Sequence, residues 1–396
     1  GRQFFVKVGG PAGTGKSVVL KKYADFVRRF YMRGEACVIA APTACAALLV
    51  GGVTLHFLLK LMPWQKPFTR MNAVQIAVMK KALQHLKVLI IDEISLATAT
   101  LIALLDQRLQ EAFGTDEVFG GVSIVVFGDL LQLPPVPTVK CGQEYTFRAI
   151  RQGERSEKLV DYLVSHCSMD GDGPADIFRE LRRLCPKKPA GDFIVLAPTE
   201  QVKLLNTWIV EHSKNVVEIA PLSTRPPTCP VNAYARRRSE EETLRLVVGR
   251  RIMITDNILD RSDKFLLNGL MGTLIGVTAE FVEMKRLDNG RVMKITHLPF
   301  KRANGAGGVW FQFPVAMAEA ITVNKSQGMT FNGVVLLSEH MERSGNFYTA
   351  LSRARSFRSV KITNIGSVLY RACTAAKQEL EIMRRRTTRL ASLNIL

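Results

Sequence analysis

An apolar run that ends in a glycine-rich loop constrains this chain's fold more than any other stretch. Residues 4–8 have strand character, and they lead into Gly10-x-x-x-x-Gly15-Lys16-Ser17. Glycines in such a loop let backbone N–H groups converge on phosphate oxygens, and the following helix offers its positive N-terminal end. A chance glycine-rich turn is the alternative, but a strand before and a helix after disfavour it. The pattern predicts a nucleoside triphosphate site in an α/β fold.

Each polar group of this loop has an expected role. Lys16 would reach the β- and γ-phosphates, and the Ser17 hydroxyl would ligate Mg²⁺. The phosphates would be lined by Gly10, Gly13, Thr14 and Gly15. Apolar residues with helical periodicity follow Ser17, and we expect that helix to end at Gly34.

Two further apolar runs end in polar side chains. Residues 88–91 lead into Asp92 and Glu93, and residues 123–127 lead towards Gln132. The carboxyl ends of parallel strands form one edge of a sheet, where such sites lie. We therefore expect Asp92 to hold Mg²⁺ through water, Glu93 to orient and deprotonate the attacking water, and Gln132 to lie near the γ-phosphate.

The charge of the chain indicates its partner. Lys and Arg number 54 against 35 Asp and Glu, a net charge of +19, which favours a polyanion and most often nucleic acid. The 396 residues suffice for two or three domains, and no apolar run approaches the ~18 residues of a membrane span. Seven scattered cysteines without a Cys-x-x-Cys pair are typical of a reduced intracellular protein. Because the chain starts at Gly1, we expect an upstream portion with any targeting sequence.

Several motifs in order resemble those of the petite-integration-frequency (Pif) DNA helicases of superfamily one. The motifs are residues 10–17, 92–95, 127–136, 320–331 and 348–356. Residues 105–109 and 119–121 resemble the family's own signature segment and favour this branch over its RecD-like cousins. The resemblance spans nearly the whole chain. It implies an ATP-dependent helicase that moves 5′→3′ on single-stranded DNA and unwinds duplexes in genome maintenance, including replication, repair, recombination and telomere or mitochondrial DNA.

The resemblance also implies the domain organisation, two RecA-like parallel-sheet motor domains with a small inserted SH3-like β domain. Residues 1–140 would form domain one, with 52–86 as a small insertion or wedge, and 141–190 would connect the domains. Domain two would comprise 191–276 and 314–396, interrupted by the insert at 277–313. Strand-like runs separated by Asp288-Asn289-Gly290 and by residues 304–308 support hairpins in that insert.

Further site residues follow from the resemblance. Arg353 would act as an arginine finger from domain two, Arg151 would reach the nucleotide from the connection, and Gly328 would contact the nucleotide. The expected DNA contacts are Thr43, His56, Thr199, Thr322, Asn324, Lys325 and Ser326. The chain departs from the family at Asn324, where His is usual, and at Glu319, where Trp is frequent. Both departures are expected to lie at the nucleic-acid groove.

The implied cofactors are ATP and Mg²⁺, and the implied partners are single-stranded DNA, tailed duplexes and G-quadruplex DNA. The glutamine that reads adenine lies upstream in the family, so the preference for ATP is inferred from the resemblance. We expect no membrane partner, a monomer that could associate on DNA, and an intracellular location, nuclear or mitochondrial in a eukaryote. Two alternatives stay open: a nucleotide-switched protein that grips nucleic acid without unwinding it, and an unrelated phosphate-loop kinase. The kinase would leave the motif around Arg353 and the basic tail unexplained.

Overall fold

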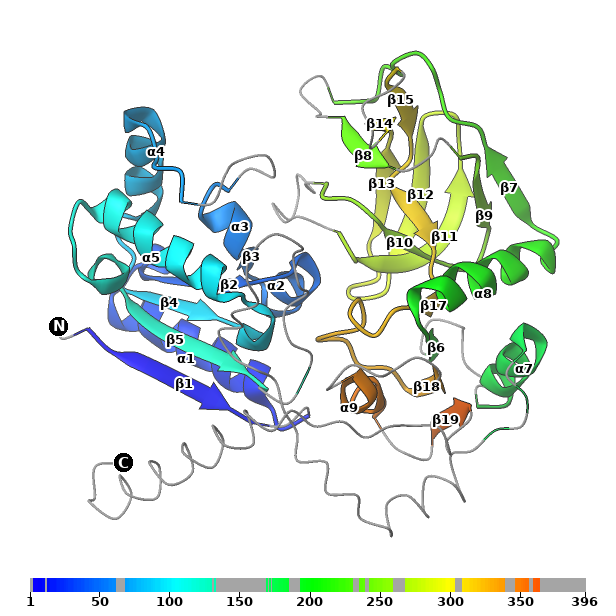
Figure 1. The fold of residues 1–396 in the computed structure, drawn as a ribbon, viewed down its shortest axis with the longest axis horizontal. Coiled ribbons are helices and arrows are strands. Elements are labelled where there is room, and N and C mark those ends of the chain that lie inside the picture. Colours follow the sequence, from blue (N-terminus) through cyan, green and yellow to red (C-terminus); the bar gives the residue numbers. More distant parts are fainter. Residues whose placement is uncertain are drawn as a thin grey trace, which may run out of the picture.

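The computed structural model describes most of the chain between Gln3 and Thr363. The described residues are 3–10, 13–61, 68–129, 132, 169, 171, 173–184, 193–230, 235–238, 242–258, 268–302, 308–338, 346–355 and 359–363. They form two lobes that lie side by side (Figure 1). We call the described residues up to Gln132 the first lobe and those from Met169 onwards the second lobe.

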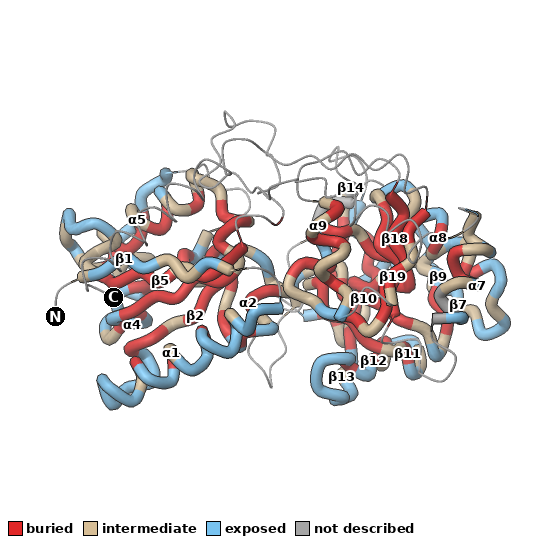
Figure 2. Tube along the Cα trace, turned by 90° about the horizontal axis from the view of Figure 1, so that it is seen from below, coloured by how far each residue is buried: buried red, intermediate tan, exposed pale blue. Residues whose placement is uncertain are grey.

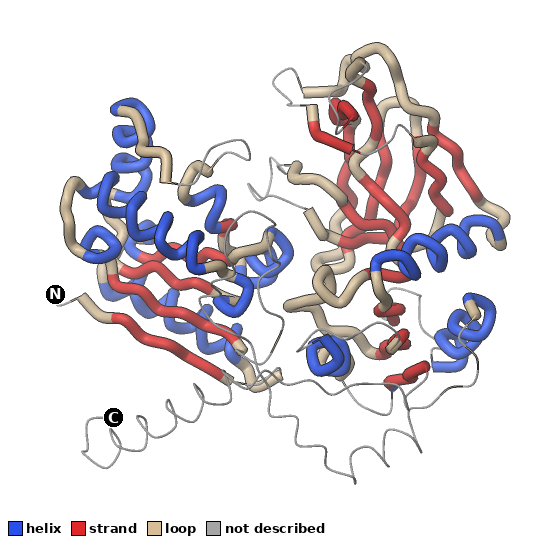
Figure 3. Tube along the Cα trace, viewed as in Figure 1, coloured by secondary structure: helices blue, strands red, loops and turns tan. Residues whose placement is uncertain are grey.

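The first lobe is built on a parallel sheet with strand order β1-β5-β4-β2-β3. The strands are β1 (Phe5–Gly9), β2 (Cys37–Ala41), β3 (Val53–Thr54), β4 (Val88–Ile91) and β5 (Ser123–Gly128). Every residue of β4 is buried, because helices cover both faces of the sheet (Figure 3). The predicted parallel α/β fold is confirmed here.

The helices of the first lobe begin and end at local signals. They are α1 (Lys16–Phe30), α2 (Ala44–Val50), α3 (Leu55–Leu58), α4 (Ala73–Leu83) and α5 (Ala99–Phe113), with short 3₁₀ turns at η1 (Gly34–Ala36), η2 (Ile94–Leu96) and η3 (Val118–Gly121). A capping box between Asn72 and Gln75 starts α4, and a left-handed Gly114 ends α5. The expected end of α1 at Gly34 is wrong, since the helix stops at Phe30 and Gly34 begins η1.

Residues 52–86, the predicted insertion, comprise β3, α3 and α4 within the described part. The fully buried Arg108 of α5 fastens this segment to the lobe. Its guanidinium donates to the Thr69 carbonyl at 2.8 Å and to Glu111 at 2.8 Å. Glu111 also accepts from the Met71 backbone at 3.2 Å. A buried charge-assisted network of this kind fixes the entry into α4 relative to α5.

The second lobe contains another parallel sheet, with strand order β17-β6-β18-β19. Its strands are β6 (Phe193–Leu196), β17 (Ala320–Ile321), β18 (Gly333–Leu337) and β19 (Val360–Thr363), accompanied by helices α7 (Pro174–Leu184), α8 (Thr199–Glu211) and α9 (Asn346–Leu351). The described part of the predicted 141–190 connection includes α7, which packs Ile177 and Phe178 into the core of the second lobe. The repeated parallel arrangement is consistent with two RecA-like units.

An antiparallel sheet with order β13-β12-β11-β10-β16 rests on this second parallel unit (Figure 1). Its strands are β10 (Arg251–Ile254), β11 (Met271–Val277), β12 (Phe281–Arg286), β13 (Val292–Thr296) and β16 (Val315–Met317), and beside it lie β7 (Val216–Ile219), β8 (Arg236–Arg238), β9 (Leu244–Val247), β14 (Leu298–Arg302) and β15 (Trp310–Gln312). The predicted hairpin between β12 and β13 is present. The sheet extends past residues 277–313 on both sides, and an SH3-like identity for that segment stays a prediction.

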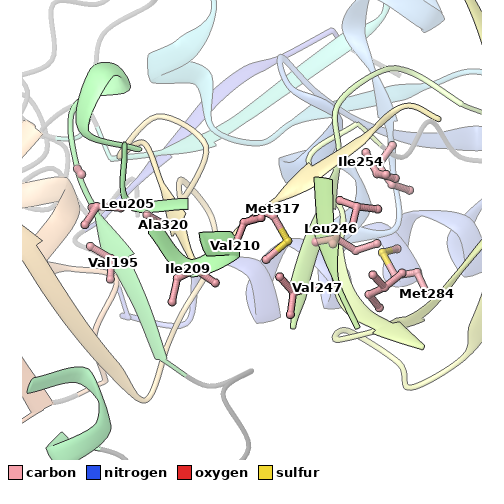
Figure 4. Packing of buried hydrophobic residues seen from close by; sticks show 14 of the residues in the cluster. Val195, Leu205, Ile209, Val210, Leu246, Val247, Ile254, Met284, Met317 and Ala320 are labelled. Atoms are coloured by element: carbon pink, nitrogen blue, oxygen red, sulfur yellow. The ribbon is translucent and has the colours of Figure 1, made fainter. Parts of the chain in front are cut away.

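Each lobe has its own buried apolar core (Figure 2). In the first lobe, alternate residues of β4 face opposite sides, so Ile90 packs with Leu20 of α1 and Leu89 packs with Leu105 of α5. The largest cluster of the second lobe runs from the parallel unit to the antiparallel sheet (Figure 4). It includes Val195, Leu205, Ile209, Val210, Leu246, Val247, Ile254, Met284, Met317 and Ala320. The shared core joins these two sheets into one body. No helix within the described ranges is long and apolar enough to cross a membrane.

Candidate functional site

The phosphate-binding loop leaves the carboxyl end of β1 and enters α1 at Lys16. Gly13 and Gly15 have φ angles of +75° and +84°, which glycine adopts without strain. The Lys16 ammonium donates to the Gly10 carbonyl at 2.7 Å. A Cβ on Gly10 would lie 3.1 Å from the Thr14 hydroxyl, so the loop is tightly turned. Ser17 is exposed in the first turn of α1, and this geometry suits a phosphate cradle.

Asp92 and Glu93 follow β4 at the same edge of the sheet. Asp92 is buried, and its carboxylate accepts from the Glu93 backbone N–H at 3.0 Å. Burial, with the nearby charge of Glu93, raises the pKa of Asp92 to about 6. Glu93 has φ +51°, a left-handed conformation that a non-glycine residue adopts at a cost and that often marks a functional site. Burial raises the pKa of Glu93, while the Arg353 guanidinium acts in the opposite direction.

Three side chains of the second lobe reach the polar groups of this edge. Gln327 donates its amide N–H to Glu93 at 3.4 Å. The phenol of Tyr348 donates to the Asp129 carboxylate at 3.2 Å. The Arg353 guanidinium donates to the Gln132 amide oxygen at 3.5 Å. Parts of the chain more than 200 residues apart in sequence therefore meet around one carboxylate-rich edge.

Arg353 is held in place from its own lobe. Its guanidinium donates to the Thr349 carbonyl at 2.9 Å and to the Met329 carbonyl at 3.1 Å, and only 3% of the residue is exposed. Because these bonds fix a planar guanidinium, the group that faces Gln132 is oriented before any ligand arrives. The structure places Arg353 at the contact between the lobes, and its expected role as an arginine finger stays a prediction.

Sequence reasoning did not assign roles to Gln327, Tyr348 or Asp129. Each lies inside a recognised motif segment, which is the signal that could have raised attention. Motif membership could not say which side chain of the other lobe each would meet, because that partner depends on the tertiary arrangement.

Helix α2 forms a second contact between the lobes. The backbone at Gly328 has φ +80°, and a Cβ there would lie 3.0 Å from Leu49 of α2. A Cβ on Gly269 would lie 3.5 Å from Cys45, at the start of the same helix. Leu48 packs against the main core cluster of the second lobe. The structure places Gly328 at this contact, and its expected role in nucleotide binding stays a prediction.

Most of the predicted DNA contacts lie on the surface. Exposed members are Thr43, His56, Thr199, Asn324 and Lys325, and Thr322 is half-buried. The Thr43 side chain also accepts from the Ala46 backbone at 3.3 Å and so caps α2. Ser326 is different: it is fully buried and its hydroxyl donates to the Val323 carbonyl at 2.7 Å. The structure thus assigns its side chain to holding the loop rather than to a DNA-facing surface.

The expected position of Glu319 at a nucleic-acid groove is wrong. Its side chain is buried in the second lobe, 1% exposed, and accepts from the Arg251 backbone at 3.0 Å. The Arg251 guanidinium also donates to the Phe193 carbonyl at the start of β6. Glu319 therefore helps to join β10 to the parallel sheet. Arg151 lies outside the described residues.

A family model described as PIF1-like helicase matches residues 1–163. This first part of the chain is similar to the PIF1-like helicases. The ATP-dependent DNA helicase PIF1 of Danio rerio is 28% identical over 393 residues, which cover 89% of this chain and 57% of that protein. The human protein of the same name is 27% identical and is matched over 91% of this chain and 58% of its own length. The chain thus spans a little over half of these relatives.

Solved structures of Pif1 helicases are similar to this chain over nearly its whole length. The crystal structure of Pif1 helicase from Candida albicans is 25% identical, with a TM-score of 0.67, and the match covers 98% of this chain and 96% of that one. A Bacteroides Pif1 bound to single-stranded DNA has a TM-score of 0.66 at 24% identity and covers 98% of this chain and 94% of that one, a likeness of fold. The likeness of fold therefore extends beyond the residues that the family model matches.

Proposed function

We propose that this protein is an ATP-dependent DNA helicase that moves 5′→3′ along single-stranded DNA and unwinds tailed duplexes. The observation that carries the proposal is a set of three hydrogen bonds between the lobes. They join Gln327 to Glu93, Tyr348 to Asp129 and Arg353 to Gln132. A nucleotide held at such an interface couples its hydrolysis to the relative position of two bodies. A kinase would need no such second lobe.

Hydrolysis in this proposal uses the first lobe for binding and the second for completion. Lys16 and the backbone of the glycine-rich loop hold the phosphates, and Glu93 takes a proton from water. The water oxygen bonds to the γ-phosphorus as the bond to the bridging oxygen of the departing ADP breaks. Arg353 faces the charge that develops on the transferred group, a contribution typically worth ~10³–10⁵ in rate.

Magnesium fits the donor groups at this edge. The Ser17 hydroxyl and the Asp92 carboxylate are oxygen ligands, and Mg²⁺ is usually bound through one or two carboxylates plus substrate phosphates. No cluster of three or more His, Cys, Asp or Glu side chains occurs among the residues that the structure describes. On the chemistry of these oxygen donors we assign Ser17 and Asp92, with the nucleotide, as the groups that would hold the metal, whose charge would offset that of the phosphates.

Single-stranded DNA is the proposed track. The net charge of +19 favours a polyanion, and the exposed Thr43 and Thr199 stand at the N-terminal ends of α2 and α8, one in each lobe. Alternate opening and closing of the lobes would then move a strand held at both helix ends. Because Glu319 is buried, this departure from the family pattern does not alter the surface offered to DNA.

Two assays decide between the candidate functions. ATP hydrolysis with and without oligo-dT should show stimulation by DNA, and Glu93→Gln should abolish turnover while nucleotide binding persists. A duplex with a 5′ tail should be unwound, whereas a 3′-tailed duplex should not. DNA-stimulated hydrolysis without displacement of either strand would indicate the gripping protein instead. Hydrolysis that ignores DNA would contradict both nucleic-acid functions.

The wider assignments are proposals of the same kind. A role in genome maintenance, action on G-quadruplex DNA and a monomeric state rest on the family alone. So does the compartment, nuclear or mitochondrial in a eukaryotic cell. Sedimentation with and without DNA tests the monomer, and a folded quadruplex placed ahead of the duplex tests the substrate range.

A further inference from the structure

The carboxylate of Glu93 is held from the opposite lobe. Within the described part of the chain, the one hydrogen bond that this carboxylate receives comes from the Gln327 amide, at 3.4 Å. Charged groups also face it from several elements: Lys16 of the phosphate loop, Asp92 beside it, Asp129 after β5 and Arg353 after α9. The orientation of Glu93 thus depends on Gln327.

Gln327 is built into a rigid turn. The turn begins at Thr322, whose carbonyl accepts from the Ser326 backbone at 3.2 Å, and the Ser326 hydroxyl closes it onto Val323. Gly328 follows with φ +80° and rests against Leu49 of the first lobe. The turn is therefore fixed within its own lobe and seated on the other, and Gln327 projects from between these two supports.

The other end of the Gln327 amide is also informative. Only 3% of the residue is exposed, and its carbonyl oxygen has no hydrogen-bond partner among the described residues. A buried acceptor left unpaired costs about 1–3 kcal/mol, so such groups usually serve a purpose. Here the oxygen belongs to the amide that holds the expected general base. Its place suits acceptance of the second hydrogen of the water that Glu93 deprotonates.

We propose that Gln327 is a positioning residue for Glu93, supplied by the second lobe, so that the general base is oriented only while the lobes are together. This inference rests on the proposed ATP hydrolysis. It means that closure does two things: it delivers Arg353 to the phosphate and sets the angle of the base. In an open enzyme, bound nucleotide would face neither Arg353 nor a correctly oriented Glu93. Hydrolysis in the absence of DNA would therefore be suppressed.

Gln327→Met tests the inference, because methionine has a similar size and no amide. In DNA-stimulated hydrolysis we expect kcat to fall at least tenfold, and by no more than the ~10²–10⁴ that a general base contributes. KM for ATP and affinity for oligo-dT should stay within about twofold, and the melting temperature should not fall. Thr330→Ala, an exposed change three residues along the chain, is the control and should match the parent.

A double-mutant cycle separates positioning from an independent effect. In single-turnover reactions, adding Gln327→Met to Glu93→Gln should cause no further loss, because the base that Gln327 orients is already gone. An equal further loss would overturn the proposal, as would a parental kcat in Gln327→Met. Should that variant melt early, Gln327→Glu replaces it: this change keeps the shape, removes the donor and should lower kcat at least as far. A parent that does not hydrolyse ATP would instead refute the proposed function itself.

Discussion

At the residue scale, Asp92 is a group of the proposed site whose buried charge lowers the stability of the folded protein. Its carboxylate is buried, and its pKa of about 6 lies above the ordinary value of 3.8. Between about pH 4 and pH 6 the unfolded chain holds fewer protons than the folded one, so stability falls as the pH rises. Without Mg²⁺ and nucleotide, Asp92→Asn should raise the free energy of unfolding at pH 7.5 by on the order of 1–3 kcal/mol.

Thermal unfolding from pH 4 to pH 8 measures this effect, and the gain should shrink towards pH 4. The exposed Asp116→Asn serves as control and should change little. The Asp92 variant should also lose hydrolysis, since its amide is a poor substitute for a metal-binding carboxylate. A lower melting temperature at pH 7.5 would contradict the destabilisation assigned to the buried charge of Asp92.

A second prediction at this scale concerns Lys325 and the binding of single-stranded DNA. Its side chain is exposed, and its backbone N–H donates to the Thr322 hydroxyl at 3.4 Å. If its ammonium contacts a phosphate, Lys325→Ala should weaken all single-stranded sequences about equally. The slope of log affinity against log salt should flatten by ~0.7, the value for each neutralised phosphate of a single strand. Titration of fluorescent oligo-dT at several salt concentrations measures the slope, and an unchanged slope would exclude the contact.

At the scale of elements, the corner between β13 and β14 contains a buried histidine. The ring of His297 lies 3.7 Å from that of Phe313, centroid to centroid, and is 2% exposed. Burial lowers the pKa of His297 to about 4. As the pH falls from about 6.5 to 4, His297 becomes protonated in the unfolded chain but stays neutral in the folded state. The free energy of unfolding therefore decreases over that range.

His297→Leu should therefore flatten the loss of stability on acidification between pH 6.5 and 4. Chemical denaturation at a series of pH values measures this, with a change on the order of 1–3 kcal/mol across the range. The control His212→Leu alters an exposed ring just after the C-terminal end of α8 and should retain the parental pH dependence. An identical slope in the His297 variant would show that other groups cause the acid loss.

At the scale of the whole molecule, the bond between Tyr348 and Asp129 links the two lobes at 3.2 Å. Asp129 is 3% exposed, so Tyr348→Phe would leave a buried carboxylate with one donor fewer. A hydrogen bond to a charged group is worth about 1.5–3 kcal/mol. We expect kcat/KM for ATP to fall by about tenfold or more.

A cycle with Asp129→Asn should be non-additive, because both changes break the same link. Tyr31→Phe, on the exposed end of the first helix, should match the parent. Additive losses in the cycle would mean that the two side chains act separately in solution.

The amino-acid sequence was enough to predict the phosphate loop, the carboxylates after β4 and the parallel character of the first sheet. These features depend on local physics: glycines for a tight turn, continuous apolar runs for strands buried on both faces, and polar residues where those strands end. The family motifs added Arg353, and the structure places that residue beside Gln132.

Which side chains meet depends on the tertiary structure. Gln327 and Tyr348 stand in motifs, but their contacts with Glu93 and Asp129 join residues more than 200 positions apart. The same holds for burial: Glu319 and Ser326 are polar residues in a segment expected to face DNA, and both are buried and hydrogen-bonded within the second lobe. A polar side chain can be buried without a large cost when it has a hydrogen-bond partner there. Tertiary packing, and not the neighbouring sequence, determines which group that partner is.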